Sequence, residues 1–336
     1  MQTPREAFLA MVRGEHADYM VSHYDVMCGL IFPGDRYMKF PDYDAYGAGY
    51  DEWGVKWQNM GPNPGKDGST VFPGFKLFDD MSEWKEHVHF PDYTKFPAAE
   101  MLKGMKNAMH YDPENKYLNT TFLSGQFERL HHMIGFEDAL AAFYEYPDEM
   151  HEYMDAFCEY RLNQIDLVYE AVQPDSIGMQ DDWGQNNNMF FSPEIWREFI
   201  KPNEIRYVEK IHDYGMLYMH HSCGYIRQII PDLVEIGVDI IEPMMVENGV
   251  PELMKDYGKD ILFMGGINNR LIEGSKSREE RRQEVERAFR ECLPLGKWVP
   301  QYVSVNEEYF NDFMDDIHDL VSKQTLITPD KPNPWE

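Results

Sequence analysis

One stretch of the chain, residues 216–243, constrains the fold more than any other; it reads MLYMHHSCGYIRQIIPDLVEIGVDIIEP. Its apolar run at 216–219 predicts a buried strand. The aliphatic residues spaced through 226–236 predict a helix that Gly237 ends, and the apolar run at 238–241 predicts a second strand. A strand, a helix and a strand in this order indicate parallel strands, and parallel α/β folds bind ligands at the carboxyl ends of their strands.

A candidate metal site follows the first of these strands. His221 and Cys223 are two positions apart, so in an extended backbone they share one face and can converge on one ion, while Ser222 turns away. Imidazole and thiolate are both zinc ligands, and Glu242 at the end of the next strand is the expected third, leaving a position for water or substrate. Ordinary burial of the cysteine and simple hydrogen bonding of the histidine are the alternatives. If Glu242 points away, the substitutes are Asp181, Asp182 and Glu307.

Two adjacent carboxylates, Asp181 and Asp182, follow another predicted strand at 176–179. Neighbouring side chains of an extended segment diverge, so one can face the pocket as a base or substrate anchor while the other caps a loop or helix. Both are candidate catalytic residues, and a purely structural role for either stays open.

Other predicted strand ends supply candidates for substrate binding. A strand at 116–123 leads to a tight turn, one at 261–264 leads to two glycines, and the runs at 19–24 and 298–303 predict the first and last strands. For His23, in the predicted first strand, a structural role is the main alternative to substrate binding. The candidates are Gln126, His23, Trp183, Gly266, Asn268 and Tyr302.

Residues 29–97 are rich in glycine, proline and aromatic residues and show little sustained periodicity, so they predict an excursion over the mouth of the fold. Its aromatic residues either form a wall for a flat organic substrate or a corrinoid, or pack as a cluster that holds the excursion down. They are Tyr37, Phe40, Tyr43, Tyr46, Tyr50, Trp53 and Trp57.

The alternation of predicted strands and helices favours a (β/α)8 TIM barrel, a fold that commonly needs about 250 residues or more. The 336 residues, of which 43% are hydrophobic, are enough for one such barrel with insertions. We therefore expect residues 1–336 to form a single domain, with the excursion at 29–97 and a proline-rich tail at 324–336.

Charge and cysteine content exclude several classes of partner. The 59 acidic and 31 basic residues give a net charge of −28, which repels nucleic acid and anionic membrane surfaces. Four widely spaced cysteines do not form a disulfide framework. The first residues lack the apolar core of a signal peptide, and no apolar run reaches bilayer length. We expect a cytoplasmic protein.

Residues 216–243 resemble the uroporphyrinogen decarboxylase superfamily, specifically its zinc methyltransferase branch, in which a His-x-Cys-Gly motif at the same strand end binds zinc. The likeness extends over nearly the whole chain and follows the order of segments in the family. The further matching segments are TPREAFLAMVRGE at 3–15, YDEWGVKW at 50–57, DDWG at 181–184, SPEIWREFIKP at 192–202 and FMGGIN at 263–268.

The chain departs from two patterns of the superfamily. Its methyltransferases that use coenzyme M typically have a further cysteine near the last strand, where this chain reads WVPQYV at 298–303; Cys292 lies earlier, in a predicted helix. The decarboxylases carry an arginine-containing RQAGRY-like segment after the first strand, where this chain reads SHYDVMCG at 22–29. The second departure disfavours decarboxylation of uroporphyrinogen.

The resemblance implies methyl transfer involving a corrinoid protein. Zinc can activate a thiol acceptor or polarise the leaving atom of a methyl donor, and the absence of the late cysteine together with the aromatic excursion favours the second mode. We expect O-demethylation of a small methoxylated, aromatic donor, with the corrinoid (cobalamin) supplied by a partner protein because the chain has no D-x-H-x-x-G segment. A decarboxylase and a non-catalytic zinc- or corrinoid-binding protein are the alternatives. The direction of transfer and the oligomeric state, a homo-oligomer included, stay open.

Overall fold

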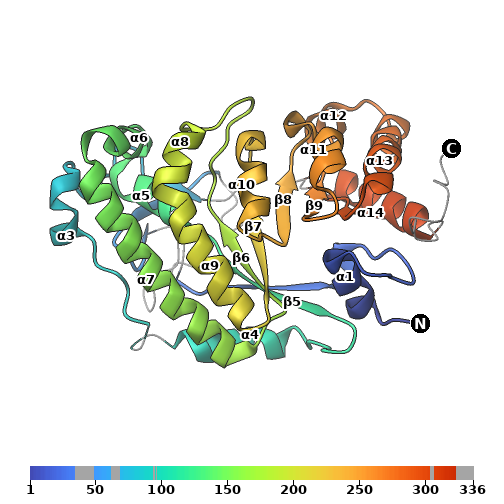
Figure 1. Cartoon of the computed structure of the whole chain (residues 1–336), viewed down its shortest axis with the longest axis horizontal. Helices are drawn as coiled ribbons and strands as arrows, with labels where there is room; N and C mark the ends of the chain where they lie inside the picture. The colour runs from blue at the N-terminus through green and yellow to red at the C-terminus, as the bar shows by residue number, and fades with distance from the viewer. Residues whose placement is uncertain (35–48, 62–68, 94, 96, 303–305, 323–336) are drawn as a thin grey trace.

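Among the residues that the structure describes, seven parallel strands form one curled sheet, and helices surround it (Figure 1). The structure is a computed structural model that describes residues 1–34, 49–61, 69–93, 95, 97–302 and 306–322. The strands lie in the sheet in chain order: β1 (Met27–Ile31), β5 (Tyr117–Phe122), β6 (Ser176–Gln180), β7 (Leu217–His221), β8 (Ile240–Met244), β9 (Leu262–Gly265) and β10 (Trp298–Val299). This is the TIM-barrel-like α/β architecture that the sequence predicts.

Helices connect each strand to its parallel neighbour, as right-handed crossover connections require. Within the part of the chain that the structure describes, no helix is both long enough and apolar enough to cross a membrane. The α-helices that connect or flank the barrel strands are α1 (Pro4–Arg13), α2 (His23–Val26), α4 (Ala98–Ala108), α5 (Gln126–Ile134), α6 (Phe136–Glu145), α7 (Pro147–Val172), α8 (Pro193–Ile195), α9 (Lys201–Asp213), α10 (Ile230–Glu235), α11 (Val250–Tyr257), α12 (Asn269–Gly274), α13 (Arg278–Cys292) and α14 (Glu307–Ser322). The shorter turns are η2 (Trp196–Ile200), η3 (Arg227–Ile229), η4 (Val246–Asn248) and η5 (Leu293–Leu295).

The register of β6, β7 and β8 determines which residues lie side by side at the carboxyl ends of these strands. Gln180 of β6 pairs with His221 of β7, and His221 pairs with Glu242 of β8. Because the strands are parallel, the residues that follow each of them emerge at the same edge of the sheet.

The prediction of a first strand at residues 19–24 is wrong. His23 begins α2, and the first strand is Met27–Ile31, which pairs with β5 from Met27↔Tyr117 onward. The hydroxyl of Tyr24 donates to the backbone oxygen of Tyr302 at 2.7 Å and accepts from its nitrogen at 2.9 Å. Tyr24 therefore packs against the last part of the barrel rather than pairing as part of a strand.

The barrel is less complete than predicted. Among the described residues the sheet has seven strands instead of eight, and β1 and β10 do not pair with each other. Tyr24 and Tyr302 join the segments that precede β1 and follow β10, so these contacts span the gap. The predicted last strand at 298–303 is a strand over Trp298–Val299, and residue 303 lies outside the described residues.

The excursion at 29–97 contains a small antiparallel sheet. Its strands are β2 (Gly49–Tyr50), β3 (Lys56–Asn59) and β4 (Ser69–Val71), and the helical turns η1 (Met81–Glu83) and α3 (Trp84–His87) follow. Of its predicted aromatic wall, Tyr37, Phe40, Tyr43 and Tyr46 lie outside the described residues. The extent of the domain and the tail at 324–336 stay predictions, and the tail is also outside them.

Two tryptophans of the excursion pack inward. Trp53 stacks on Phe157 of α7 with ring centroids 5.8 Å apart, and Trp57 meets the ring of His132 on α5 at 5.0 Å. Both tryptophans are buried, whereas Tyr50 is 51% exposed. For Trp53 and Trp57 the structure therefore supports the alternative in which the aromatic residues hold the excursion against the helices.

Candidate metal centre

Three ligand atoms converge beyond the carboxyl ends of β6 and β7. The Nε2 atom of His221 lies 3.5 Å from the Sγ of Cys223 and 3.7 Å from the Oδ1 of Asp182, and suitable ligand atoms of all three residues lie within 4.8 Å of one another. Bonds of about 2.0–2.3 Å to a tetrahedral zinc ion place ligand atoms about 3.3–3.7 Å apart. The imidazole, thiol and carboxylate thus fit a zinc ion with one position left open.

Glu242, the expected third ligand, lies on the other side of the imidazole. Its Oε1 is 2.7 Å from Nδ1 of His221, and its Oε2 accepts a hydrogen bond from Nε2 of Gln301 at 2.8 Å. The β7–β8 register explains this placement, because Glu242 is paired directly with His221 rather than with the residues beyond it. A carboxylate at Nδ1 holds the proton there and directs the Nε2 lone pair toward Cys223 and Asp182.

His221 and Glu242 each stabilise the charged form of the other. Burial acts to lower the pKa of His221, yet the Glu242 carboxylate raises it well above the ordinary histidine value. Burial acts to raise the pKa of Glu242, and the charge of His221 brings it below the ordinary glutamate value. Glu242 is therefore ionised at neutral pH and holds the imidazole in one orientation.

The two adjacent carboxylates diverge, as the sequence predicts. The Oδ1 of Asp182 accepts a hydrogen bond from the backbone nitrogen of Cys223 at 2.7 Å, which joins the β6 end to the β7 end. Asp181 instead accepts from the backbone nitrogens of Phe127 at 3.2 Å and Glu128 at 2.8 Å, in the first turn of α5. Burial raises the pKa of Asp181 to about 7. Asp182 belongs to the ligand group, and Asp181 caps a helix.

Two glycines allow the loops after β6 and β7 to touch. A Cβ on Gly224, whose φ is +82°, would lie 2.4 Å from the carbonyl carbon of Gly184, and one on Gly184 would lie 2.6 Å from the nitrogen of Tyr225. The backbone nitrogen of Trp183 also donates to Oγ of Ser222 at 2.9 Å. Larger residues at either glycine would separate Asp182 from Cys223.

Three of the predicted substrate-binding residues are buried, and their role in substrate binding stays a prediction. His23 is buried, and burial lowers its pKa to about 4. Trp183 is fully buried and stacks on His220 with ring centroids 4.0 Å apart. Gln126 is buried, and its Oε1 accepts from Asn203 of α9 at 2.9 Å. Gln126 and Trp183 pack among buried residues of the helices and sheet, whereas His23 also lies near enough to Glu242 for their charges to interact.

The other three candidates lie near the ends of β9 and β10. Gly266 is buried and donates its N–H to the backbone oxygen of Met244 at 2.7 Å. Asn268 caps α12 by accepting from the nitrogen of Leu271 at 3.0 Å, and it lines a small cavity together with Gln301. Tyr302 is buried, and its hydroxyl donates to Glu273 at 2.5 Å. Asn268 is the one of these three that the structure places at a cavity beside the ligand group.

One predicted residue, Glu307, and two residues that were not predicted, His220 and Gln301, are placed as follows. Glu307 is exposed at the start of α14. His220 faces α9, with Nδ1 3.6 Å from Oε2 of Glu204, so it packs against a helix. Gln301 was not among the predicted site residues, although a polar residue within the apolar run at 298–303 was its available signal.

Comparison with known proteins places the chain in a family. The family model for uroporphyrinogen decarboxylase (URO-D) matches residues 102–300, a range that contains Asp182, His221, Cys223 and Glu242. No curated protein sequence matches the chain.

Solved structures support the fold. A methyltransferase from Methanosarcina mazei is similar with a TM-score of 0.66 and 14% sequence identity, covering 95% of this chain and 99% of that chain. A Xaa-Pro dipeptidase with bound methionine in its active site reaches a TM-score of only 0.33 at 14% identity, covering 66% of this chain and 56% of that one, and carries no argument. The family match extends over more than half of the sequence. The chain belongs to the uroporphyrinogen decarboxylase family.

Proposed function

We propose that this protein is a zinc-dependent methyltransferase that moves a methyl group from a small methoxylated, aromatic donor to a partner corrinoid protein. The observation that carries the proposal is the convergence of His221 Nε2, Cys223 Sγ and Asp182 Oδ1 at the carboxyl ends of adjacent parallel strands. A three-ligand group leaves a position for a substrate atom, as catalytic zinc sites do. The fold it shares with a methyltransferase from Methanosarcina mazei is consistent with the proposal.

The residues around the group have defined tasks in this reaction. Asp182, His221 and Cys223 would hold the ion, and Glu242 keeps the proton on Nδ1 of His221 so that Nε2 can bind the metal. Gln301 in turn orients Glu242. Zinc, when bound, supplies Lewis acidity that polarises the ether oxygen of the donor.

The corrinoid is assigned to a separate protein. The sequence has no D-x-H-x-x-G segment of the kind found in cobalamin-binding domains. In the proposed reaction the C–O bond of the methoxy group breaks, the methyl group passes to the reduced cobalt of the partner, and the released oxygen anion is protonated from solvent. Electrons balance, because the two electrons of the new Co–C bond come from cob(I)alamin and those of the C–O bond stay with oxygen.

Decarboxylation is the second candidate, because the matching family model is named for that reaction. The two reactions differ in their need for metal, since the decarboxylase reaction of the family uses none. The net charge of −28 also disfavours a substrate with many carboxylates.

A direct assay separates the two candidates. Purified protein is mixed with its corrinoid partner in the cob(I)alamin state and a panel of methoxylated aromatics, and formation of methylcobalamin is followed optically. We expect Cys223→Ser to lose methylation together with the zinc ion of this site, and Cys28→Ser, at a half-buried cysteine on β1, to keep both. Unchanged zinc content in Cys223→Ser would refute the metal site. Failure across the panel with release of carbon dioxide from uroporphyrinogen would favour the decarboxylase.

A further inference from the structure

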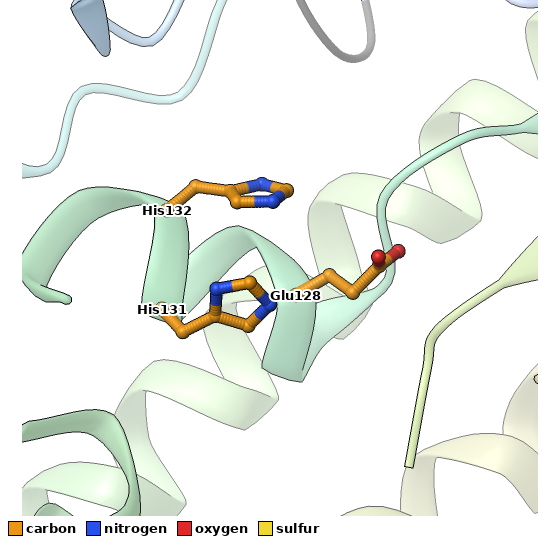
Figure 2. A group of neighbouring side chains, drawn as sticks. All are labelled: Glu128, His131 and His132. Atoms are coloured by element: carbon orange, nitrogen blue, oxygen red, sulfur yellow. The ribbon is translucent and has the colours of Figure 1, made fainter. Parts of the chain in front are cut away.

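A second group of potential metal ligands lies on α5, outside the site described above. Glu128, His131 and His132 offer a carboxylate oxygen and two imidazole nitrogens that lie within 4.8 Å of one another. Figure 2 shows the three side chains leaving the same helix and extending in the same direction. Apart from the Asp182, His221 and Cys223 group, this is the one such cluster among the described residues.

The spacing of these residues explains how Glu128 meets each of the two histidines, whose own rings lie with centroids 4.4 Å apart. Positions three and four apart are neighbours on a helix surface, so Glu128 at position i faces both His131 at i+3 and His132 at i+4. A Glu-x-x-His pair on one helix is also the unit from which carboxylate-bridged metal sites in helical bundles are built. Two imidazoles and one carboxylate form the ligand set of several zinc enzymes and of non-haem iron sites with open positions.

The surroundings hold the group in place. Glu128 and His132 are buried and His131 is partly exposed, so an ion there would be largely shielded from water yet reachable. The ring of His132 lies edge-on to Trp57 with centroids 5.0 Å apart, and that of His131 lies 5.4 Å from the ring of Phe136. The first turn of α5 is anchored by Asp181, which accepts the backbone N–H of Glu128 itself.

The distances require only a small adjustment. Bonds of about 2.0–2.2 Å place the ligand atoms of a tetrahedral ion about 3.3–3.6 Å apart. The ligand atoms of Glu128, His131 and His132 lie within 4.8 Å of one another, so each pair is at most about 1.2–1.5 Å beyond this spacing.

We propose that Glu128, His131 and His132 bind a second divalent transition-metal ion, with open positions for water or another ligand, independently of Asp182, His221 and Cys223. Zinc and iron(II) are the natural ions for this ligand set, and cobalt(II) serves as a coloured probe for both groups. The two groups differ in chemistry, because only the first contains a thiolate.

Cobalt titration of the metal-free, full-length protein tests this proposal. We expect two cobalt ions per chain, of which one gives the near-ultraviolet charge-transfer absorption of a cobalt–thiolate bond and the other gives only visible ligand-field absorption. In Cys223→Ser the thiolate absorption should vanish while the second ion stays. A missing thiolate band in wild type would refute the first site without affecting the second.

Variants of α5 make the test specific. Glu128→Gln and His131→Gln should each lower the affinity for the second cobalt ion and leave the thiolate band unchanged. The loss should exceed the about 10- to 100-fold that removal of a residue hydrogen-bonded to a metal ligand costs. His16→Gln, at an exposed histidine elsewhere, should leave both ions in place. Wild-type protein that binds no cobalt ion besides the one with thiolate absorption, or an ion with ligand-field absorption alone that persists in both α5 variants, would overturn the proposal. The number of wild-type cobalt ions without thiolate absorption decides the matter even if a variant fails to fold.

Discussion

The Nδ1 atom of His221 lies 2.7 Å from Oε1 of Glu242, on the opposite side of the ring from the nitrogen that faces Cys223 and Asp182. In the proposed zinc site this relationship would make Glu242 a positioning residue rather than a ligand. Gln301 holds its second oxygen, so the imidazole is oriented by a chain of two hydrogen bonds.

Glu242→Gln should lower zinc affinity by about 10- to 100-fold, because the neutral amide no longer stabilises the proton on Nδ1 of His221. Competition with a chromophoric chelator measures this affinity. Glu235→Gln, at an exposed side chain after β7, is the control and should bind zinc as wild type does. Equal affinities of the two variants would mean that Glu242 does not orient His221.

Gly224→Ala should destabilise the fold and weaken zinc binding, because the added Cβ would lie 2.4 Å from the backbone of Gly184. Gly215→Ala is a matched control: its φ is +72°, close to the +82° of Gly224, but nothing lies within 4 Å of its Cβ. Backbone strain alone costs about 1–2 kcal/mol and applies to both. Urea denaturation should therefore show a larger loss for Gly224→Ala, and equal losses would exclude a role for the contact between the loops.

Asp51→Asn should cost about 3–5 kcal/mol in the free energy of unfolding, the usual penalty for breaking a buried ion pair. The carboxylate pairs with Arg129 at 2.7 Å and accepts from the nitrogens of Trp53 and Val55, both at 2.9 Å, so it joins the excursion to α5. Asp79→Asn, at a side chain that is 88% exposed, is the control and should change stability by less than about 0.5 kcal/mol. Similar denaturation midpoints for both variants would argue against this anchor.

The stability of the protein should fall as pH rises through the range set by Glu204. Burial raises the pKa of Glu204 from 4.5 to about 8, and its carboxyl group contacts the hydroxyl of Tyr218. The folded state therefore holds a proton that the unfolded chain releases above pH 4.5. The contribution of this proton to the free energy of unfolding is fully present below pH 4.5 and is lost as the pH rises to about 8.

Comparison of wild type with Glu204→Gln isolates this contribution. The variant should show a flatter dependence of unfolding free energy on pH, by a few kcal/mol over the whole range. Glu209→Gln, at an exposed position of the same helix, should keep the slope of wild type. A wild-type slope in Glu204→Gln would show that Glu204 does not carry the effect.

Local patterns determined the parts of the fold and site that depend on neighbouring residues in the chain. The alternation within 216–243 predicted the β7–helix–β8 unit, and the two-residue spacing of His221 and Cys223 predicted that they share a face. The divergence of Asp181 and Asp182 followed from the same geometry. The first strand was misplaced because the aromatic run at 19–24 has strand-like composition, whereas the true strand, MCGLI, contains a glycine and a cysteine.

Only the tertiary structure decided which carboxylate joins His221 and Cys223. In the sheet, Gln180 and Glu242 pair directly with His221 from the two sides, so Glu242 meets the ring at Nδ1. Asp182 lies two residues beyond Gln180, level with Cys223. The contact between Gly184 and Gly224 brings Asp182 close to Cys223. The register between strands and the approach of two loops are set by packing across the sheet, and no periodicity within one segment of the sequence encodes them.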